Sequence, residues 1–271
     1  VDVQALVRGS AMGYLQSAQL LSEEFAVTQA KQPRTDVALL PSSTDQRTVA
    51  ALASTGVTAV ILPDSDVPQA GFRTSTASAR SEIQLDIDAS GNPLDSETSL
   101  PALTIDSVVS NALSGALNSG DAESDSESET IAQLDSLDSQ QLVLALSAAT
   151  YLELPNEPRA MLLALNRAGM NDYGEGDTNP GALQTTLTAL MAAPWVTPTT
   201  VSEMLNLDTT YIEREQLTTA HSLKNGITHS QLTSLDEAEN TIARYANLSS
   251  DPSVLMTPTR DAIGRALALA W

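Results

Sequence analysis

The chain has 271 residues and carries 34 Asp+Glu against 13 Lys+Arg, a formal net charge of −21 that repels phosphate backbones, so we expect no nucleic-acid partner. It contains no cysteine, which excludes disulfides and thiolate metal sites, and its 42% of hydrophobic residues suffices for a sizeable core. No stretch approaches the roughly 18 consecutive apolar residues of a bilayer-spanning helix, so we expect no direct membrane insertion of residues 1–271.

The first third of the sequence predicts alternating helices and strands. Apolar residues recur at helical spacing over 13–30, and the short apolar run 37–40 is typical of a buried strand. A helix is predicted over 44–55, with Gly56 closing it. The segment 57–62 (VTAVIL) is apolar almost throughout, which favours a parallel strand covered on both faces.

The middle of the sequence predicts a hairpin followed by helices. The alternation in 82–88 indicates an exposed hairpin strand, with Gly91 and Asn92 in its turn. Helices are expected over 105–117 and 130–152, the second with Leu137 and Leu152 among its inward residues. The run 161–165 (MLLAL) is predicted as a second buried strand, parallel to 57–62 in the same sheet.

The last third of the sequence is predicted to be helical. Asn179-Pro180 opens one helix, and Thr200 and Glu203 form a capping box before a second. Further helices are expected over 228–247 and over 258–271, the latter capped by Thr257. Because the last helix is still running at residue 271, we expect the natural protein to continue beyond it.

Charge is unevenly distributed along the chain. No Lys or Arg lies between Arg80 and Arg159, whereas 15 acidic residues do. The centre of this stretch, 119–129 (SGDAESDSESE), alternates acidic residues with Ser, Gly or Ala. It predicts a solvated, mobile loop because such a segment cannot bury apolar surface. An acidic tether or a weak cation-binding segment is the alternative interpretation.

Carboxylates that follow the two predicted buried strands are the candidate catalytic residues. Asp64 and Asp66 follow 57–62, and Asp172 and Glu175 follow 161–165. Carboxylates at the C-terminal ends of parallel strands supply the acid and base of many barrel enzymes, or an oxygen-only cation site. In a chain with 34 acidic residues, some also follow strands by chance.

Residues for metal or cofactor chemistry are few. The only two histidines, His221 and His229, are eight positions apart and do not form a helical i,i+4 pair, so we predict neither a metal site nor a cofactor. No nucleophile elbow and no glycine-rich phosphate loop occurs. Trp195 is a candidate ligand-contact residue for a sugar ring, with a buried anchor as the alternative.

Four segments carry a resemblance to a known family. In chain order they are 45–67 (DQRTVAALASTGVTAVILPDSDV), 159–165 (RAMLLAL), 179–201 (NPGALQTTLTALMAAPWVTPTTV) and 266–271 (ALALAW), and they resemble an uncharacterised actinobacterial family of large exported, membrane-anchored proteins. The resemblance implies proteins that consist of a signal peptide, a β-rich region, a barrel similar to polysaccharide deacetylases, and a C-terminal membrane helix. Their genes tend to lie beside the lipid-II flippase homologue.

The resemblance implies an extracytoplasmic protein of the cell envelope, with the signal peptide and membrane anchor outside residues 1–271. Cell-wall glycan or envelope proteins are the implied partners. Polysaccharide deacetylases bind a metal through an Asp-Asp pair and a His-x-x-x-His motif, and this sequence has neither. Metal-dependent deacetylation is therefore not expected.

The sequence as a whole predicts an α/β fold: a partial or irregular (β/α) barrel over 1–220, with a helical extension over 221–271 packed on it. The alternative fold is a small open doubly wound sheet. The function hypothesis is a non-catalytic scaffold or binding domain of the cell envelope. The alternative is a carbohydrate-active hydrolase of glycosidase or deacetylase type that uses Asp64, Asp66, Asp172 and Glu175.

Overall fold

The computed structural model describes residues 3–9, 11–29, 34–71, 75–117, 136–165, 180–208, 214–217 and 227–269. The chain divides into two compact units. Unit 1 comprises Val1–Val60, Ile83–Leu100 and Leu217–Trp271, and unit 2 comprises Ile61–Glu82 and Pro101–Gln216. The predicted acidic loop 119–129 and the predicted domain boundary at residue 220 lie outside the described residues.

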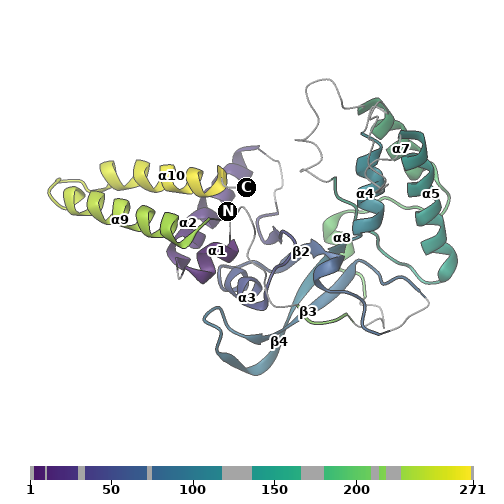
Figure 1. Ribbon diagram of the computed structural model, residues 1–271, viewed down its shortest axis with the longest axis horizontal. Helices are drawn as coiled ribbons and strands as arrows, with labels where there is room; N and C mark the ends of the chain where they lie inside the picture. The colour runs from purple at the N-terminus through teal and green to yellow at the C-terminus, as the bar shows by residue number, and fades with distance from the viewer. Residues whose placement is uncertain are drawn as a thin grey trace, which may run out of the picture. The chain divides into compact units, whose positions relative to one another are not determined.

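A four-stranded open sheet has the strand order β1-β2-β4-β3. Figure 1 labels three of its strands, β2, β3 and β4. Its strands are β1 (Val37–Leu39), β2 (Ala59–Pro63), β3 (Arg80–Ile87) and β4 (Pro93–Ile105). The unit limits fall inside β2, β3 and β4. The predicted α/β class is confirmed, but the described strands form an open sheet and show no closure into the predicted partial or irregular barrel. The hairpin of β3 and β4 also distinguishes this open sheet from a doubly wound sheet, in which successive strands are joined through helices.

Helix α3 (Gln46–Ser54) lies within the helix predicted over 44–55. The Asp45 carboxylate caps its first turn by accepting a hydrogen bond from the Thr48 amide at 2.8 Å. Gly56 follows the last turn with φ of 99°, a left-handed conformation that favours glycine. The helix joins two neighbouring strands, β1 and β2, as expected, although β1 is less buried than its apolar run suggested, with Leu39 69% exposed.

The β3–β4 hairpin confirms the predicted turn. Asp88 donates its amide to the carbonyl of Asn92 at 2.8 Å, and its carboxylate accepts from the Ser90 and Asn92 amides. Gly91 has φ of 88° within this turn. The long strand β4 was not predicted, because its first half is exposed and polar and lacks an apolar alternation.

Helices complete unit 1. They are α1 (Val3–Arg8), α2 (Met12–Gln29), α3, α9 (His229–Ala246) and α10 (Ser253–Leu269). Helix α1 packs against α2 and α3, and α10 packs against α9 and α2. Helices α9 and α10 run side by side as a hairpin (Figure 1). Helix α9 confirms the helix predicted over 228–247, and a capping box of Thr228 and Gln231 opens it.

The beginning of α10 differs from the prediction. The helix begins at Ser253, so Thr257 is not its cap and Pro258 lies inside it. The prediction placed Pro258 in the first turn, where proline is most easily tolerated, because a proline deeper in a helix lacks an N–H for the hydrogen-bond ladder.

Helices also surround the core of unit 2. They are α4 (Ser107–Gly115), α5 (Ser136–Glu153), α7 (Pro180–Ala192) and α8 (Val201–Leu205), with a short 3-10 turn η1 at Asp64–Asp66. Helices α4, α5 and α7 pack together (Figure 1). Their core has four buried residues at its centre: Val109, Ala112, Leu113 and Val143. The predicted capping box of Thr200 and Glu203 opens α8.

The segment 161–165 is not the regular strand that the sequence predicted. A single parallel bridge joins Leu162 to Ile105 at the end of β4. The segment is half-buried, and its apolar side chains are divided between two core clusters: Met161 and Leu163 pack with Val109 and its neighbours, whereas Leu162 packs with Leu103. An apolar segment can therefore contribute side chains to two core clusters without pairing as a regular β-strand.

Candidate functional site

A cavity of about 290 Å³ in unit 2 lies where β2 and β4 end. Strand β2 ends at Pro63 and β4 ends at Ile105, and the residue after each is an aspartate that lines the cavity. Ligands of open α/β sheets bind outside the carboxyl ends of strands. The lining is mixed polar and apolar, and its polar side chains are Asp64, Ser65, Gln69, Thr76, Thr104, Asp106, Thr150 and Arg214.

Asp64 is the one predicted candidate that the structure places in this cavity. Its Oδ1 accepts hydrogen bonds from the Ser107 amide at 3.3 Å and from the Ser107 hydroxyl. Ser107 is the first residue of α4, so the Asp64 carboxylate binds the N-terminus of that helix. Asp66, the second candidate of the same segment, is only 4% exposed and does not line the cavity.

Asp106 is the cavity's second carboxylate and was not among the predicted site residues. It is the N-cap of α4 and accepts a hydrogen bond from the Val109 amide at 2.9 Å. Burial raises the pKa of Asp106 above its usual value, and the charge of Asp64 adds to the increase. The sequence signal that could have identified Asp106 is its position directly after a strand. This signal was missed because the sequence did not reveal that β4 extends to Ile105.

Arg214 is the cation of the cavity. Its Nη1 donates to the Val67 carbonyl at 3.0 Å, and its Nη2 donates to the Ser78 carbonyl at 3.1 Å and to the Thr104 hydroxyl at 2.8 Å. Burial lowers the pKa of this guanidinium, while the charges of Asp64 and Asp106 oppose that shift. No local sequence motif marks Arg214, because its partners are distant in the sequence.

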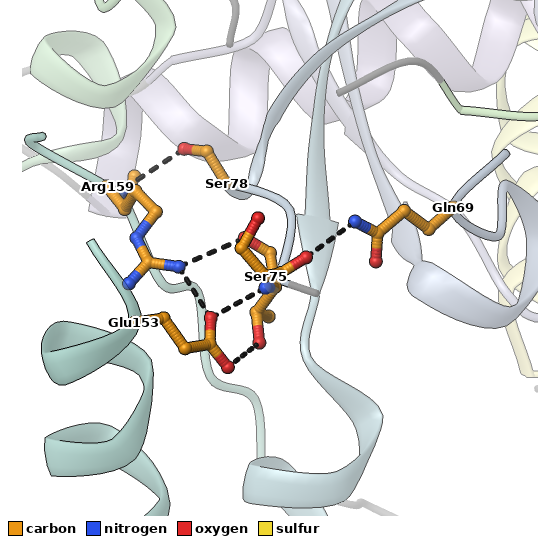
Figure 2. A network of polar contacts seen from close by, with 7 residues as sticks. Gln69, Ser75, Ser78, Glu153 and Arg159 are labelled. Carbon is orange, nitrogen blue, oxygen red and sulfur yellow. Dashed lines mark hydrogen bonds and ion pairs between the residues drawn. The ribbon is translucent and has the colours of Figure 1, made fainter. Parts of the chain in front are cut away.

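A second polar network lies beside the cavity, and Thr76 belongs to both (Figure 2). Glu153 accepts hydrogen bonds from the Thr76 amide at 2.6 Å and from its hydroxyl at 3.0 Å. Arg159 Nη1 bridges the Glu153 carboxylate at 2.8 Å and the Thr76 carbonyl at 3.2 Å. Figure 2 also shows Gln69, which donates to the Ser75 carbonyl at 2.7 Å. These hydrogen bonds and the Glu153–Arg159 ion pair connect the end of α5 to the segment before β3.

The other predicted site residues are not brought to this cavity. Asp172, Glu175 and His221 lie outside the described residues, and His229 is the first residue of α9 in unit 1. Trp195 is half-buried and donates from Nε1 to the Ser147 hydroxyl at 3.2 Å. Its contact with a ligand stays a prediction.

The arrangement offers acid–base chemistry or polar binding. Two carboxylates and a guanidinium share one cavity, and the pKa of one carboxylate is raised. Such a pair of neighbouring carboxyl groups suits acid–base chemistry. Within the described part of the chain, no group of three or more His, Cys, Asp or Glu side chains is placed to hold a metal ion.

Comparisons with other proteins point to one family. No curated protein and no solved structure is significantly similar to this chain. Among the described helices, none is both long enough and apolar enough to cross a membrane. Residues 2–271 match the model of a family of unknown function (DUF6049), and the chain therefore belongs to that family.

Proposed function

We propose that this chain is a non-catalytic binding domain of a larger exported protein of the cell envelope. One observation carries the proposal: the charged groups of the cavity in unit 2 are already bound to the backbone of the protein itself. Asp64 and Asp106 accept hydrogen bonds from the first turn of α4, and Arg214 donates to two carbonyls and a hydroxyl. These groups stabilise the walls of a cavity, which suits binding better than turnover.

The partner we propose is an uncharged segment of cell-wall glycan. With a net charge of −21, the chain repels anionic polymers, whereas neutral sugar hydroxyls are not repelled. Hydroxyls and an amide in the lining, from Thr76, Thr150 and Gln69, are groups that hydrogen-bond to sugars. The extracytoplasmic location rests on the family resemblance of the sequence.

A carbohydrate-active hydrolase is the second candidate, because one specific observation favours it. Asp106 has a raised pKa and shares its cavity with Asp64. Two carboxyl groups in one site, one acting as acid and the other as base or nucleophile, are the pair that glycosidases use. In this alternative, Asp106 is the general acid and Asp64 is the base or the nucleophile.

Amide substitutions distinguish the two candidates. Asp106→Asn keeps the helix cap, because asparagine caps as well as aspartate, but removes the titratable group. For the binding domain, we expect no hydrolysis of peptidoglycan-type or chitin-type oligosaccharides by the wild type, measured by mass spectrometry of the products. Turnover that falls about 100-fold or more in Asp106→Asn and Asp64→Asn, with thermal stability retained, would establish the hydrolase instead.

The matched control is Asp45→Asn. Asp45 caps α3 through the Thr48 amide in the same way as Asp106 caps α4, but it does not line the cavity. A loss of turnover in Asp45→Asn equal to that in Asp106→Asn would indicate damage to the fold rather than lost chemistry.

Binding is tested by co-sedimentation of the full chain with insoluble cell-wall glycan. Thr150 lines the cavity from α5, so Thr150→Trp fills it, and we expect glycan binding to fall about tenfold. Leu152→Trp, on the same helix at a side chain that is 70% exposed, is the control and should bind as the wild type does. The proposal fails if the wild type does not sediment with the glycan, or if Thr150→Trp binds equally well.

A further inference from the structure

Strand β4 has an open edge in its first half, which belongs to unit 1. Strand β2 has five residues and β4 has thirteen, and both end at the cavity of unit 2, so β2 lies beside the last residues of β4. The first residues of β4, 93–98, therefore extend past β2, and β3 is their only neighbour among the described strands. Every side chain described in 93–99 is exposed. An open strand edge presents backbone N–H and C=O groups that can pair with a further strand.

A cavity of about 310 Å³ lies beside this edge, between the β3–β4 hairpin and α3 (Figure 1). The apolar and small residues of its lining come from all three elements: Ala50, Ala53, Leu85, Ile87, Leu94 and Thr98. The two alanines of α3 leave space between the helix and the hairpin because their side chains are short. The cavity shares no lining residue with the cavity of unit 2, so it takes no part in the function proposed above.

An open edge beside an apolar cavity is the arrangement by which sheets bind extended peptides. The peptide adds a strand, its main chain pairs with the edge, and alternate side chains enter pockets beside it. Leu94 and Thr98 are four positions apart and therefore lie on the same face of β4, which is the face of the cavity. Every second side chain of an added strand projects on that face. The mostly apolar lining suits an aliphatic side chain there.

The charges of the hairpin favour a cationic peptide. Asp95 follows Leu94, so its exposed side chain projects to the face opposite the cavity. Asp86 is also exposed, and its carboxylate accepts a hydrogen bond from the neutral Gln46 amide at 3.3 Å, which leaves its charge in place. Hydrogen bonds from the amide and side chain of Asn92 lower the pKa of Asp88, so this lining carboxylate is ionised at neutral pH.

A second copy of this chain is a poorer occupant of the edge. Two β4 edges paired with each other bring the acidic side chains of two hairpins together, and like charges on paired strands are destabilising. Each copy also carries a net charge of −21. Pro93 begins the strand and has no N–H, and prolines and charges are usual protection of an edge against self-pairing. A strand of opposite charge is not excluded by this protection.

We propose that the open edge of β4 binds an extended segment of a partner protein in which aliphatic and cationic residues alternate. The main chain of the segment pairs with residues 93–98. One aliphatic side chain enters the cavity beside Leu94 and Thr98, and lysine or arginine side chains on the other face lie near Asp95.

Fluorescence anisotropy of a labelled peptide titrated with the full chain tests the proposal. The probe is a heptapeptide of alternating lysine and valine, and three control peptides each change one feature. Main-chain N-methylation removes the backbone donors, serine in place of valine removes the aliphatic side chains, and glutamate in place of lysine reverses the charge. We expect the probe to bind with a Kd below about 1 mM and each control at least about tenfold more weakly. Failure of the probe to bind, or equal binding of any control, overturns the proposal.

Variants locate the binding site on the chain. Thr98→Trp fills the cavity from an exposed position, and we expect the affinity for the probe to fall about tenfold. Ser99→Trp, the matched control, places the same side chain at the next exposed position, which does not line the cavity, and should bind within about twofold of wild type. Equal losses in the two variants would refute a site in the cavity.

Sedimentation of the full chain without peptide tests the competing occupant. We expect a monomer at about 0.1 mM, because the acidic edges repel each other. A dimer that Thr98→Trp abolishes and Ser99→Trp retains would identify a second copy as the occupant and would overturn the proposal.

Discussion

Arg159 depends on Glu153 for its charge balance. The Arg159 side chain is only 5% exposed, and the Glu153 side chain that pairs with it at 2.8 Å is 29% exposed. Its second terminal nitrogen, Nη2, is buried and has no hydrogen-bond partner in the described part of the chain. Removing the Glu153 charge therefore leaves a buried cation without compensation.

We expect Glu153→Gln to lower the free energy of unfolding by about 1–3 kcal/mol at pH 7. Glutamine has nearly the same size as glutamate and keeps one oxygen that can accept a hydrogen bond from Thr76. The decrease in the free energy of unfolding therefore reports the missing charge. Urea denaturation followed by circular dichroism gives the value. Glu157→Gln, at a nearby exposed residue, is the control and should change stability by less than about 0.5 kcal/mol. Equal effects of the two substitutions would contradict the role of Glu153.

The stability difference between the wild type and Glu153→Gln is expected to depend on pH. Burial alone would raise the pKa of Glu153, but the hydrogen bonds from Thr76 and Arg159 lower it by more, and the net shift is downward. A lowered pKa means that the folded chain binds its proton less readily than the unfolded chain. The stabilisation is therefore present above the unfolded pKa of about 4.3 and is lost as pH falls below it. We expect the stability difference between wild type and Glu153→Gln to shrink between pH 7 and pH 3. A constant difference would refute this assignment.

Helix α5 shows how far periodicity predicts which side of a helix is buried. The sequence predicted Leu137 and Leu152 inside, yet they are 57% and 70% exposed. The fully buried positions are Ser139, Val143 and Ser147, spaced four residues apart. Small serines let neighbouring backbones approach closely, and Ser147 accepts the hydrogen bond from Trp195. A pattern based on leucines alone does not reveal such a face.

We expect Val143→Ala to destabilise the protein by roughly 1–3 kcal/mol, because it leaves a cavity in the cluster of Val109, Ala112 and Leu113. Leu152→Ala removes a larger side chain but should cost less than about 0.5 kcal/mol, because that side chain is exposed. Urea denaturation of both variants compares them directly. If Leu152→Ala were more destabilising than Val143→Ala, the buried side of α5 would be the one that the sequence predicted.

Helix α10 offers a second comparison between sequence and structure. Pro258 is the sixth residue of the helix and cannot donate to the carbonyl of Val254. We expect Pro258→Ala to stabilise the protein by about 1–3 kcal/mol, since alanine restores the donor and has a high helix propensity. Thermal denaturation measures the change. Destabilisation would instead favour a helix that begins at Pro258, where proline suits the first turn.

For the molecule as a whole, the sequence predicted local elements better than their assembly. The strand–helix–strand segment around α3 and the capped helices α8 and α9 depend on neighbouring residues, and their predictions are confirmed. The predicted partial or irregular barrel required 161–165 to pair as a regular strand, whereas the structure has a single bridge there, because strand pairing depends on partners distant in the sequence. The site was predicted in part for the same reason: Asp64 follows a recognisable strand, whereas Arg214 joins it only through the tertiary fold.

The excess of acidic residues predicts a response to salt. A net charge of −21 on a chain of this size causes self-repulsion in the compact state, which added ions screen. We expect the melting temperature to rise by a few degrees between about 0.02 and 0.5 M sodium chloride. Potassium chloride should act equally, since screening does not depend on the cation. A melting temperature that falls with salt would show that attractive ion pairs outweigh the repulsion.

The division into two units also determines the order in which the protein can form during synthesis. The sequence of unit 2 is complete at Gln216, whereas unit 1 needs α9 and α10, which are translated later. Helix α2 packs on α10, so one of the first helices made must wait for the last one described. We therefore expect a ribosome-arrested chain whose residue 216 has left the exit tunnel to protect unit 2 from protease while leaving α2 open to cleavage. Unit 1 would then fold only after the last helix has been released.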